Sequence, residues 1–341
     1  MLMSVAVIVA LIFVSACTKE GPAGKDGVDG KDGEPGINGQ DGTATCAVCH
    51  DNSEEVEIKI AQWGGSKHAI GGTNFENAAG CAPCHTSQGF KEALANDTTA
   101  CVAAIENPAN INCYTCHKVH DTYSEADWEL RKTDANTFWL TGDVVDLGAG
   151  NLCVRCHQPR ISYQIPDVTN PEGIYTVGST RWGPHHGPQG TTLNGLAYYK
   201  VGSDYMNSMH TNIEDGCVGC HMASPVGYNS GGHTFKVFDE EEGLNTAGCL
   251  DCHTATEAND AVEALQAEVQ TSLDSLGVLL QAAGIYNPAG TSGTAVKGDY
   301  PNKIAGAYWN FISIVEDKSM GVHNPKFVRK ILSNTITSLN N

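Results

Sequence analysis

The hydrophobic pattern divides the chain into three parts that predict different structures. An almost unbroken apolar run, VAVIVALIFV, covers residues 5–14. From residue 262 onward, apolar side chains recur at helical spacing. The long region between them has no sustained period and is rich in Gly, Pro, Asn and Thr. Hydrophobic patterning alone therefore predicts regular elements at the two ends and little regular structure between them.

Three helices are predicted in the C-terminal part. The first has one apolar face, with residues spaced by three or four positions: Val262, Leu265, Val269, Leu273, Leu276 and Leu280. Gly284 is suited to end it. A second helix is predicted over 304–315, and Asn324-Pro325 predicts the N-cap and first turn of a third, which runs to about Ser338. We expect this tail to pack against the rest of the chain or to form a dimer interface.

The N-terminal apolar run predicts export. It is shorter than the roughly 20 residues that span a bilayer and is typical of a secretory signal. The signal is predicted over 1–17, since the run ends in VSAC, which resembles a bacterial lipobox. The lipobox implies lipidation of Cys17 and a membrane anchor that does not span. One feature departs from this pattern: no Lys or Arg precedes the apolar run. The alternative is a plain signal peptide.

Residues 18–43 contain glycine at every third position, from Gly21 to Gly42. This is the Gly-X-Y period of collagen, in which only glycine fits the axis of the triple helix. With Pro22 and Pro35 as the only prolines of the segment, we expect a flexible, collagen-like spacer. A short trimerising stalk is the alternative.

The formal net charge of −19 argues against nucleic acid as a partner, because nucleic-acid binding needs a basic surface. The cysteines are more informative. Of fourteen, Cys17 and Cys101 stand alone, and the rest form six C-x-x-C-H motifs: Cys46-Cys49-His50, Cys81-Cys84-His85, Cys113-Cys116-His117, Cys153-Cys156-His157, Cys217-Cys220-His221 and Cys249-Cys252-His253. We number these motifs one to six.

The C-x-x-C-H pattern predicts covalent attachment of haem c. The two thiols add to the porphyrin vinyl groups, and the histidine is the proximal iron ligand. A redox C-x-x-C pair does not need the histidine, and zinc sites pair the motif differently. We therefore predict six covalently attached haem c groups, their cysteines serving as cofactor-binding residues. Cys101 is expected to be a free, buried thiol.

Seven histidines remain for the six distal iron positions: His68, His120, His185, His186, His210, His233 and His323. We predict that the distal ligands come from this set. His185 and His186 are adjacent, so their side chains diverge, and at least one is expected to bind iron. Met206, Met209, Met222 and Met320 are alternatives, although methionine more often fills a core.

Four segments resemble the multihaem cytochrome c superfamily that includes pentahaem nitrite reductase, hydroxylamine oxidoreductase and related electron-transfer cytochromes: "AYWNFISIVEDKSMGVHNPKFVRKIL", "SKHA", "RWGPHHGPQ" and "GGHTF". The resemblance covers roughly residues 44–340 and implies that His323, His68 and His233 are distal ligands. Nitrite reductase has a C-x-x-C-K motif at its catalytic haem, whereas all six motifs here end in histidine.

The predicted fold is mainly α with little regular structure, wrapped on six stacked haems, with C-terminal helices and no substantial sheet. We expect a hexahaem domain over 44–258 and a helical region over 259–341 that contributes His323. The predicted function is electron transfer through closely spaced bis-histidine haems, with no catalytic residue. The alternative is an enzyme that reduces nitrite, hydroxylamine or a similar substrate at one open haem, near Arg181, His185, His186 or Tyr198.

The expected partners are redox proteins, with the membrane reached through the lipid anchor alone. The expected location is the outer membrane, on its periplasmic or cell-surface face. The sequence leaves open a homo-oligomer or a filament in which a histidine, with His68 and His120 as candidates, binds a haem of the next subunit.

Overall fold

A computed structural model of the chain describes residues 54–71 and 76–340. The predicted signal, the lipidation site Cys17, the Gly-X-Y spacer and the first motif, Cys46-Cys49-His50, lie outside the described residues. Predictions about them stay predictions. Residues 42–341 form one compact unit. Among the described residues no helix is both long and apolar enough to cross a membrane.

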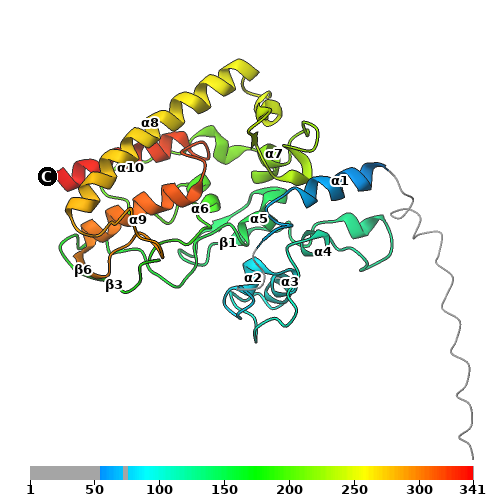
Figure 1. The fold of residues 1–341 in the computed structure, drawn as a ribbon, viewed down its shortest axis with the longest axis horizontal. Coiled ribbons are helices and arrows are strands. Elements are labelled where there is room, and N and C mark those ends of the chain that lie inside the picture. Colours follow the sequence, from blue (N-terminus) through cyan, green and yellow to red (C-terminus); the bar gives the residue numbers. More distant parts are fainter. Residues whose placement is uncertain (1–53, 72–75, 341) are drawn as a thin grey trace, which may run out of the picture. The chain divides into compact units, whose positions relative to one another are not determined.

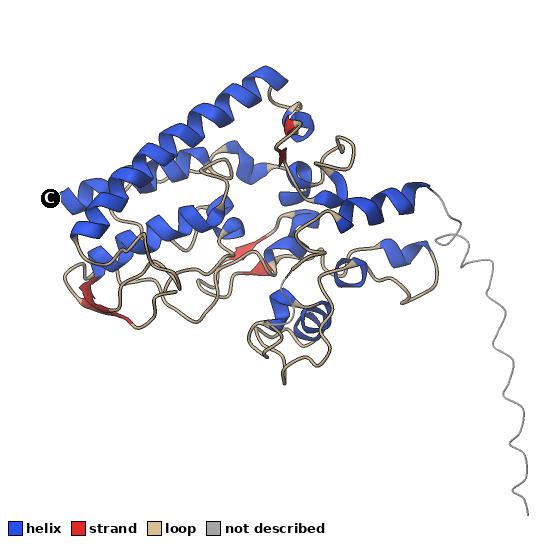
Figure 2. Cartoon of the chain, viewed as in Figure 1, coloured by secondary structure: helices blue, strands red, loops and turns tan. Residues whose placement is uncertain are grey.

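Helices and loops make up most of the fold, as Figure 2 shows. The long helices near the C-terminus are α8 (Ala255–Ala282), α9 (Asn302–Asp317) and α10 (Pro325–Asn340). The other α-helices are α1 (Glu54–Gly64), α2 (Ala82–His85), α3 (Ser87–Ala95), α4 (Cys113–Cys116), α5 (Asn151–Val154), α6 (Gln189–Asn194) and α7 (Cys217–His221). Single 3₁₀ turns are η2 (Glu125–Trp128), η3 (Gly148–Gly150), η4 (Met209–Asn212), η5 (Gly232–Thr234) and η6 (Thr246–Cys249).

The described strands form three separate antiparallel pairs. The longest joins β3 (Ile174–Val177) to β6 (Gly298–Pro301), with Ile174 opposite Pro301. The shorter pairs join β1 (Asn136–Thr137) to β2 (Val144–Val145) and β4 (Phe238–Asp239) to β5 (Gly243–Leu244). The prediction of a mainly helical chain without a substantial sheet is confirmed.

The three predicted C-terminal helices are confirmed. In α8 a capping box between Thr254 and Glu257 fixes the start, and Gly284 follows the helix with a φ of +75°, which glycine adopts readily. α8 begins before the predicted boundary at 258/259, and this division of the chain stays a prediction. At α10 the side chain of Asn324 accepts from the Phe327 N–H at 3.4 Å, as an N-cap does.

The tail packs against the rest of the chain. Its three helices contact one another (Figure 1) and bury their apolar faces together with Val177, Trp182 and Tyr198 from the preceding region. Asn310 on α9 joins two further segments, because its amide accepts from Tyr199 N and donates to Tyr199 O, both at 2.8 Å, and donates to Thr335 on α10. These hydrogen bonds hold α9 and α10 in place, and His323 lies in the turn between the two helices.

The motif-bearing region has a much smaller apolar cluster of its own. Phe138, Val145, Leu147, Val154 and Leu193 form it. The loops there are held mainly by hydrogen bonds, such as the buried amide of Asn151, which donates to Thr133 O at 3.0 Å. Such a region needs an apolar partner other than side chains, which porphyrin rings would supply.

Two glycines inside the C-terminal helices make a matched test of the packing. A Cβ at Gly306 would lie 2.2 Å from Cγ of Tyr199, whereas a Cβ at Gly277 would meet its nearest neighbour, in Tyr286, at 3.6 Å. Gly306→Ala should destabilise the holoprotein by about 1–3 kcal/mol through overpacking. Gly277→Ala should stabilise it by up to about 1 kcal/mol through helix propensity. Thermal or denaturant unfolding measures both, and shifts of the same sign would contradict this packing.

Candidate haem sites

Each described C-x-x-C-H motif contains one helical turn. In four motifs the histidine N–H donates to the carbonyl of the first cysteine, at 2.9–3.2 Å, and in the fifth motif the whole segment is α7. Residues three and four positions apart lie on one face of a helical turn. Both thiols and the imidazole of a motif therefore lie on the same side, as attachment of a porphyrin requires.

Four motif histidines each face a histidine from a distant part of the chain. The ring centroids are 6.1–6.3 Å apart in every case, and the ring planes are inclined by 33–71°. The pairs are His85 with His185, His117 with His233, His157 with His68, and His221 with His323. Four of the seven predicted distal histidines are thus placed opposite a motif histidine.

The spacing of these pairs fits an iron ion between two imidazoles. A metal–nitrogen bond to imidazole is about 2.0–2.1 Å, and the ring centre lies roughly 1.1 Å further on, so an intervening metal separates the centroids by about 6.3 Å. Direct stacking or a hydrogen bond would bring the rings closer. The residues present therefore fit a bis-histidine haem at motifs two to five.

The other ring nitrogen of each paired motif histidine is hydrogen-bonded. Nδ1 of His117 donates to Trp128 O at 2.6 Å, and Nδ1 of His221 donates to Phe235 O at 2.9 Å. The acceptors for the remaining two are a carboxylate oxygen of Glu76, 2.5 Å from His85, and the amide oxygen of Gln189, 3.2 Å from His157. A donating Nδ1 fixes the tautomer and leaves Nε2 free to bind a metal.

Burial keeps most of these imidazoles neutral. Loss of solvent lowers the pKa of His68 to about 4 and the pKa of His185 to about 3. Burial also lowers the pKa of His117, His157 and His233. Neutral imidazole is the form that binds a metal, so these histidines are ready to act as ligands near pH 7. His323 differs, because the Asp317 carboxylate raises its pKa against the opposing effect of burial.

Two further observations bear on the cofactor. Among the described residues, no three His, Cys, Asp or Glu side chains gather closely enough to hold a metal ion by themselves. Nε of Arg160 is buried without a hydrogen-bond partner, and the Arg160 charge lowers the pKa of both His85 and His185. A buried guanidinium donor beside an imidazole pair fits a haem, whose propionates would accept from it.

The three other predicted distal histidines are placed differently. His210 donates from Nδ1 to Val322 O at 2.7 Å. His120 has its Nδ1 3.2 Å from the Tyr114 hydroxyl. His186 is 72% exposed, and its Nδ1 lies 2.7 Å from a carboxylate oxygen of Glu316. His253 of motif six is exposed and belongs to none of the four ring pairs.

The cysteines of different motifs meet around the fourth motif. The thiol of Cys156 interacts with that of Cys84 in motif two, and Cys156 Sγ lies 3.7 Å from a backbone carbonyl oxygen inside that motif. Cys153 interacts with Cys217 in motif five. Cys116 in motif three is close enough to raise the pKa of both fourth-motif thiols. The fourth motif is therefore adjacent to three others.

Glycines permit the close approach of motifs four, five and six. A Cβ at Gly150, next to motif four, would lie 3.1 Å from the Cys217 nitrogen. A Cβ at Gly248, next to motif six, would lie 3.0 Å from Cα of Cys220. In motif five, the charge of Cys249 also raises the pKa of Cys220, although burial raises it more. Motif five thus lies between motifs four and six.

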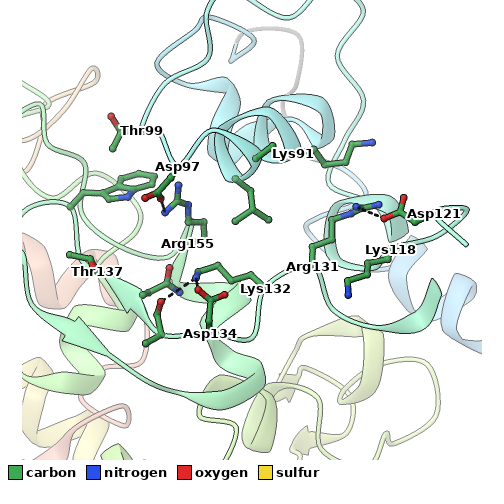
Figure 3. Close-up of a pocket in the computed structure, with 15 residues that line it drawn as sticks. Lys91, Asp97, Thr99, Lys118, Asp121, Arg131, Lys132, Asp134, Thr137 and Arg155 are labelled. Atoms are coloured by element: carbon green, nitrogen blue, oxygen red, sulfur yellow. Dashed lines mark hydrogen bonds and ion pairs between the residues drawn. The ribbon is translucent and has the colours of Figure 1, made fainter. Parts of the chain in front are cut away.

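A cavity of about 690 Å³ lies beside motif three, and Figure 3 shows its polar lining. Three of its five cations pair with acids of the lining: Arg131 lies 3.1 Å from Asp121, Lys132 lies 3.0 Å from Asp134, and Arg155 lies 3.2 Å from an Asp97 oxygen. None of the lining residues is a histidine or a cysteine. The cavity therefore does not open on a motif imidazole.

Of the residues named for an enzymatic pocket, His185 and His186 lie together, with ring centroids 4.5 Å apart, whereas Arg181 and Tyr198 bond to other groups. Arg181 donates to Ser292 O at 3.0 Å, and the buried Tyr198 hydroxyl lies 2.7 Å from the hydroxyl of Thr192. His185 has a φ of +67°, and its ring faces His85. His186 at the next position bonds to Glu316, and its ring centroid lies 4.5 Å from that of His185. The two side chains therefore stay in contact and do not diverge as predicted, although only His185 faces a motif histidine. Cys101 is a free, buried thiol, as predicted.

Sequence reasoning missed the charged residues around the imidazole pairs. Glu76 and Asp317 each bind an Nδ1, and Arg160 lies near the second motif although it follows the fourth in C-H-Q-P-R. Asp317 lies six residues before His323 and just beyond the end of the helix predicted over 304–315. This short separation in sequence was the one available sign that the two residues could interact. Nothing in the sequence links Arg160 to His85.

Comparison with known proteins gives a fold. No family model matches the chain, and no curated protein matches it. Among solved structures, the outer cell wall cytochrome OcwA aligns with a TM-score of 0.53 at 18% identity, over 82% of this chain and 50% of that one. The undecaheme cytochrome from the S-layer of Carboxydothermus ferrireducens aligns with a TM-score of 0.48 at 22% identity, over 80% and 40%.

This chain therefore spans half or less of the length of the two cytochromes. At 18% identity, the likeness to OcwA bears on the fold alone. Together with the repeated C-x-x-C-H turns and the imidazole pairs, it shows that the chain has a multihaem cytochrome fold.

Proposed function

We propose that the protein is an exported hexahaem c-type cytochrome that carries electrons between a membrane or periplasmic redox partner and an acceptor outside the cell. The observation that carries the proposal is the set of four imidazole pairs with centroids 6.1–6.3 Å apart. When bound, each haem supplies a one-electron couple whose iron stays six-coordinate in both oxidation states. The chain's part is to hold both imidazoles in place and to exclude other ligands.

The thiol contacts support a branched path. Cysteines of motifs two, three and five approach those of motif four, and motif five approaches motif six. Haems attached there would be neighbours in the same order. In this proposal motif four is the junction, motifs two and three are ends, and an arm leads through motif five to motif six.

The two remaining distal positions are assigned to His120 and His210. The Nδ1 of His210 donates to a backbone carbonyl, as in the paired motif histidines His117 and His221. Because His186 is exposed and bound to Glu316, it is the surplus histidine in this assignment. His68 faces His157 of its own chain, which leaves His120 as the candidate for a contact between subunits in a filament.

The predicted leader and lipobox support a location at the outer membrane, on the periplasmic or the cell-surface face. In this proposal Cys17 carries the lipid, and the Gly-X-Y segment over 18–43 spaces the haem domain from the membrane. Redox proteins are the partners, with no nucleic acid. The enzymatic alternative is not favoured, since Arg181 and Tyr198 bond to Ser292 and Thr192, and His186, although its ring contacts that of His185, is bound to Glu316.

The haem count and spin state test the proposal directly. Mass spectrometry of the purified holoprotein should find six haem adducts. Electron paramagnetic resonance of the oxidised protein should show low-spin iron throughout, because each iron has two imidazole ligands. Fewer than six adducts, or a high-spin signal that responds to cyanide or nitrite, would contradict the electron-carrier assignment and favour an open haem.

The dipeptide His185-His186 provides a matched pair of variants. His185→Ala should convert one of the six haems to a high-spin form that binds cyanide, since the ring opposite His85 is removed. His186→Ala should leave all six low-spin, because that ring faces Glu316. Visible spectra and cyanide titration measure both. The assignment fails if His186→Ala produces the high-spin haem and His185→Ala does not.

The junction can be tested by changing a ligand's identity. A methionine ligand raises the potential of a haem, so His68→Met should turn the fourth haem into an electron trap. The rate at which an electron leaves this haem should fall about tenfold for each 59 mV by which its potential rises. His233→Met makes the same change at motif three, an end of the path, and should leave transfer between motifs two and five unaffected. Flash photoreduction measures these rates, and equal slowing in both variants would argue against a junction.

A further inference from the structure

The imidazole pair of motif five differs from the others in its surroundings. Both of its rings have an acceptor on Nδ1, namely Phe235 O for His221 and the carboxylate of Asp317 for His323, at 2.9 and 2.7 Å. The side chain of Asp317 is completely buried. Within the described part of the chain, this is the one paired imidazole bound to a fully buried carboxylate.

The end of α9 places this carboxylate. Asp317 is the last residue of the helix, and Lys318 follows with a φ of +65°, which turns the chain back. The hydroxyl of Ser319 donates to the second oxygen of Asp317 and accepts from the N–H groups of Gly321 and His323, each at 3.2 Å. The turn thus closes around the carboxylate and holds the His323 ring against it.

We propose that Asp317 is a positioning residue that sets the reduction potential of the fifth-motif haem and makes it the lowest among the four haems with paired imidazoles. The inference rests on the proposed function. A carboxylate that accepts from Nδ1–H draws the proton towards itself and makes Nε2 of His323 a stronger donor. A stronger donor stabilises ferric iron, so the electron supplied by a redox partner is held less tightly.

Glu76 beside His85 is the closest comparison, and its effect is weaker. Its side chain is 39% exposed, so water screens the charge, whereas Asp317 is fully enclosed. The same pair of charges interacts about four times more strongly at an effective dielectric constant of 20 than in water. The Arg160 charge beside His85 also opposes the effect of Glu76. The ordering of the two sites follows from burial and from this cation.

The position of motif five means that its low potential affects electron transfer to motif six. Motif five lies between motif four and motif six, because Cys217 meets Cys153 and Cys220 lies near Cys249. An electron that passes from the junction to the sixth haem must cross this site. By lowering the potential of the fifth-motif haem, Asp317 raises the free energy of an electron at the one step that separates motif six from the rest of the path.

The test is potentiometry of the holoprotein with Asp317→Asn. The amide oxygen still accepts from Nδ1, but the charge is removed, so one of six midpoint potentials should rise by about 59 mV or more, a tenfold change in the equilibrium constant. The ferric resonance of one haem should change with it. Asp317→Glu should restore the potential. Asp274→Asn, the same substitution at an exposed site on α8, should change none.

Ser319→Ala provides a second measurement with the opposite sign. Without the hydroxyl donor the Asp317 carboxylate becomes a stronger acceptor, so the same potential should fall, a result that general loosening of the site would not give. If the Asp317→Asn protein loses haem, the midpoint potential of the Ser319→Ala protein provides the test of the proposal. Six low-spin haems with unchanged potentials in both variants would overturn the role of Asp317 alone. A high-spin haem in the unsubstituted protein would instead count against the proposed function.

Discussion

The structure depends on holding two inclined imidazole rings opposite each other across a space that fits one metal ion. Each pair joins a motif histidine to a histidine about a hundred residues away along the chain. The shared spacing of 6.1–6.3 Å is reached by distal histidines on separate segments, with His233 in the 3₁₀ turn η5 and His68, His185 and His323 in three other turns. Loops replace sheets in this region because the chain has to deliver single side chains to fixed points.

The apolar core lies mainly beside these sites and supports them from one end. The faces of α8, α9 and α10 bury a large cluster with Trp182 and Tyr198, whereas the motif region has five residues in its own cluster. The tail also contributes to two of the proposed sites. The turn between α9 and α10 carries His323, and Val322 in the same turn accepts from His210. In the proposed cytochrome the helical tail therefore takes part in cofactor binding as well as supporting the sites.

Inside this acidic protein, only a few charged side chains lie next to the imidazole pairs. The net charge of −19 describes the surface, where water and salt screen most of its effect. Near the imidazole pairs, single charges have more influence because they are enclosed: Asp317 on one ligand and Arg160 beside another pair. Haems with the same two ligands can then differ in reduction potential because their surroundings differ. In the proposed branched path, such differences would make electrons favour one branch over another.

The sequence determined the chemistry and the helices. Six C-x-x-C-H motifs predict the attachment points, because thiols and imidazole must occur at that local spacing. The apolar period of the tail identifies three helices, because apolar residues recur at every helical turn. The pairing of distal histidines required the tertiary structure, since nothing local distinguishes His185 from His186 or connects His233 to His117. The same holds for the adjacency of the motifs and for the buried Asp317, because a contact between residues far apart in sequence is decided by packing, which leaves no periodic mark along the chain.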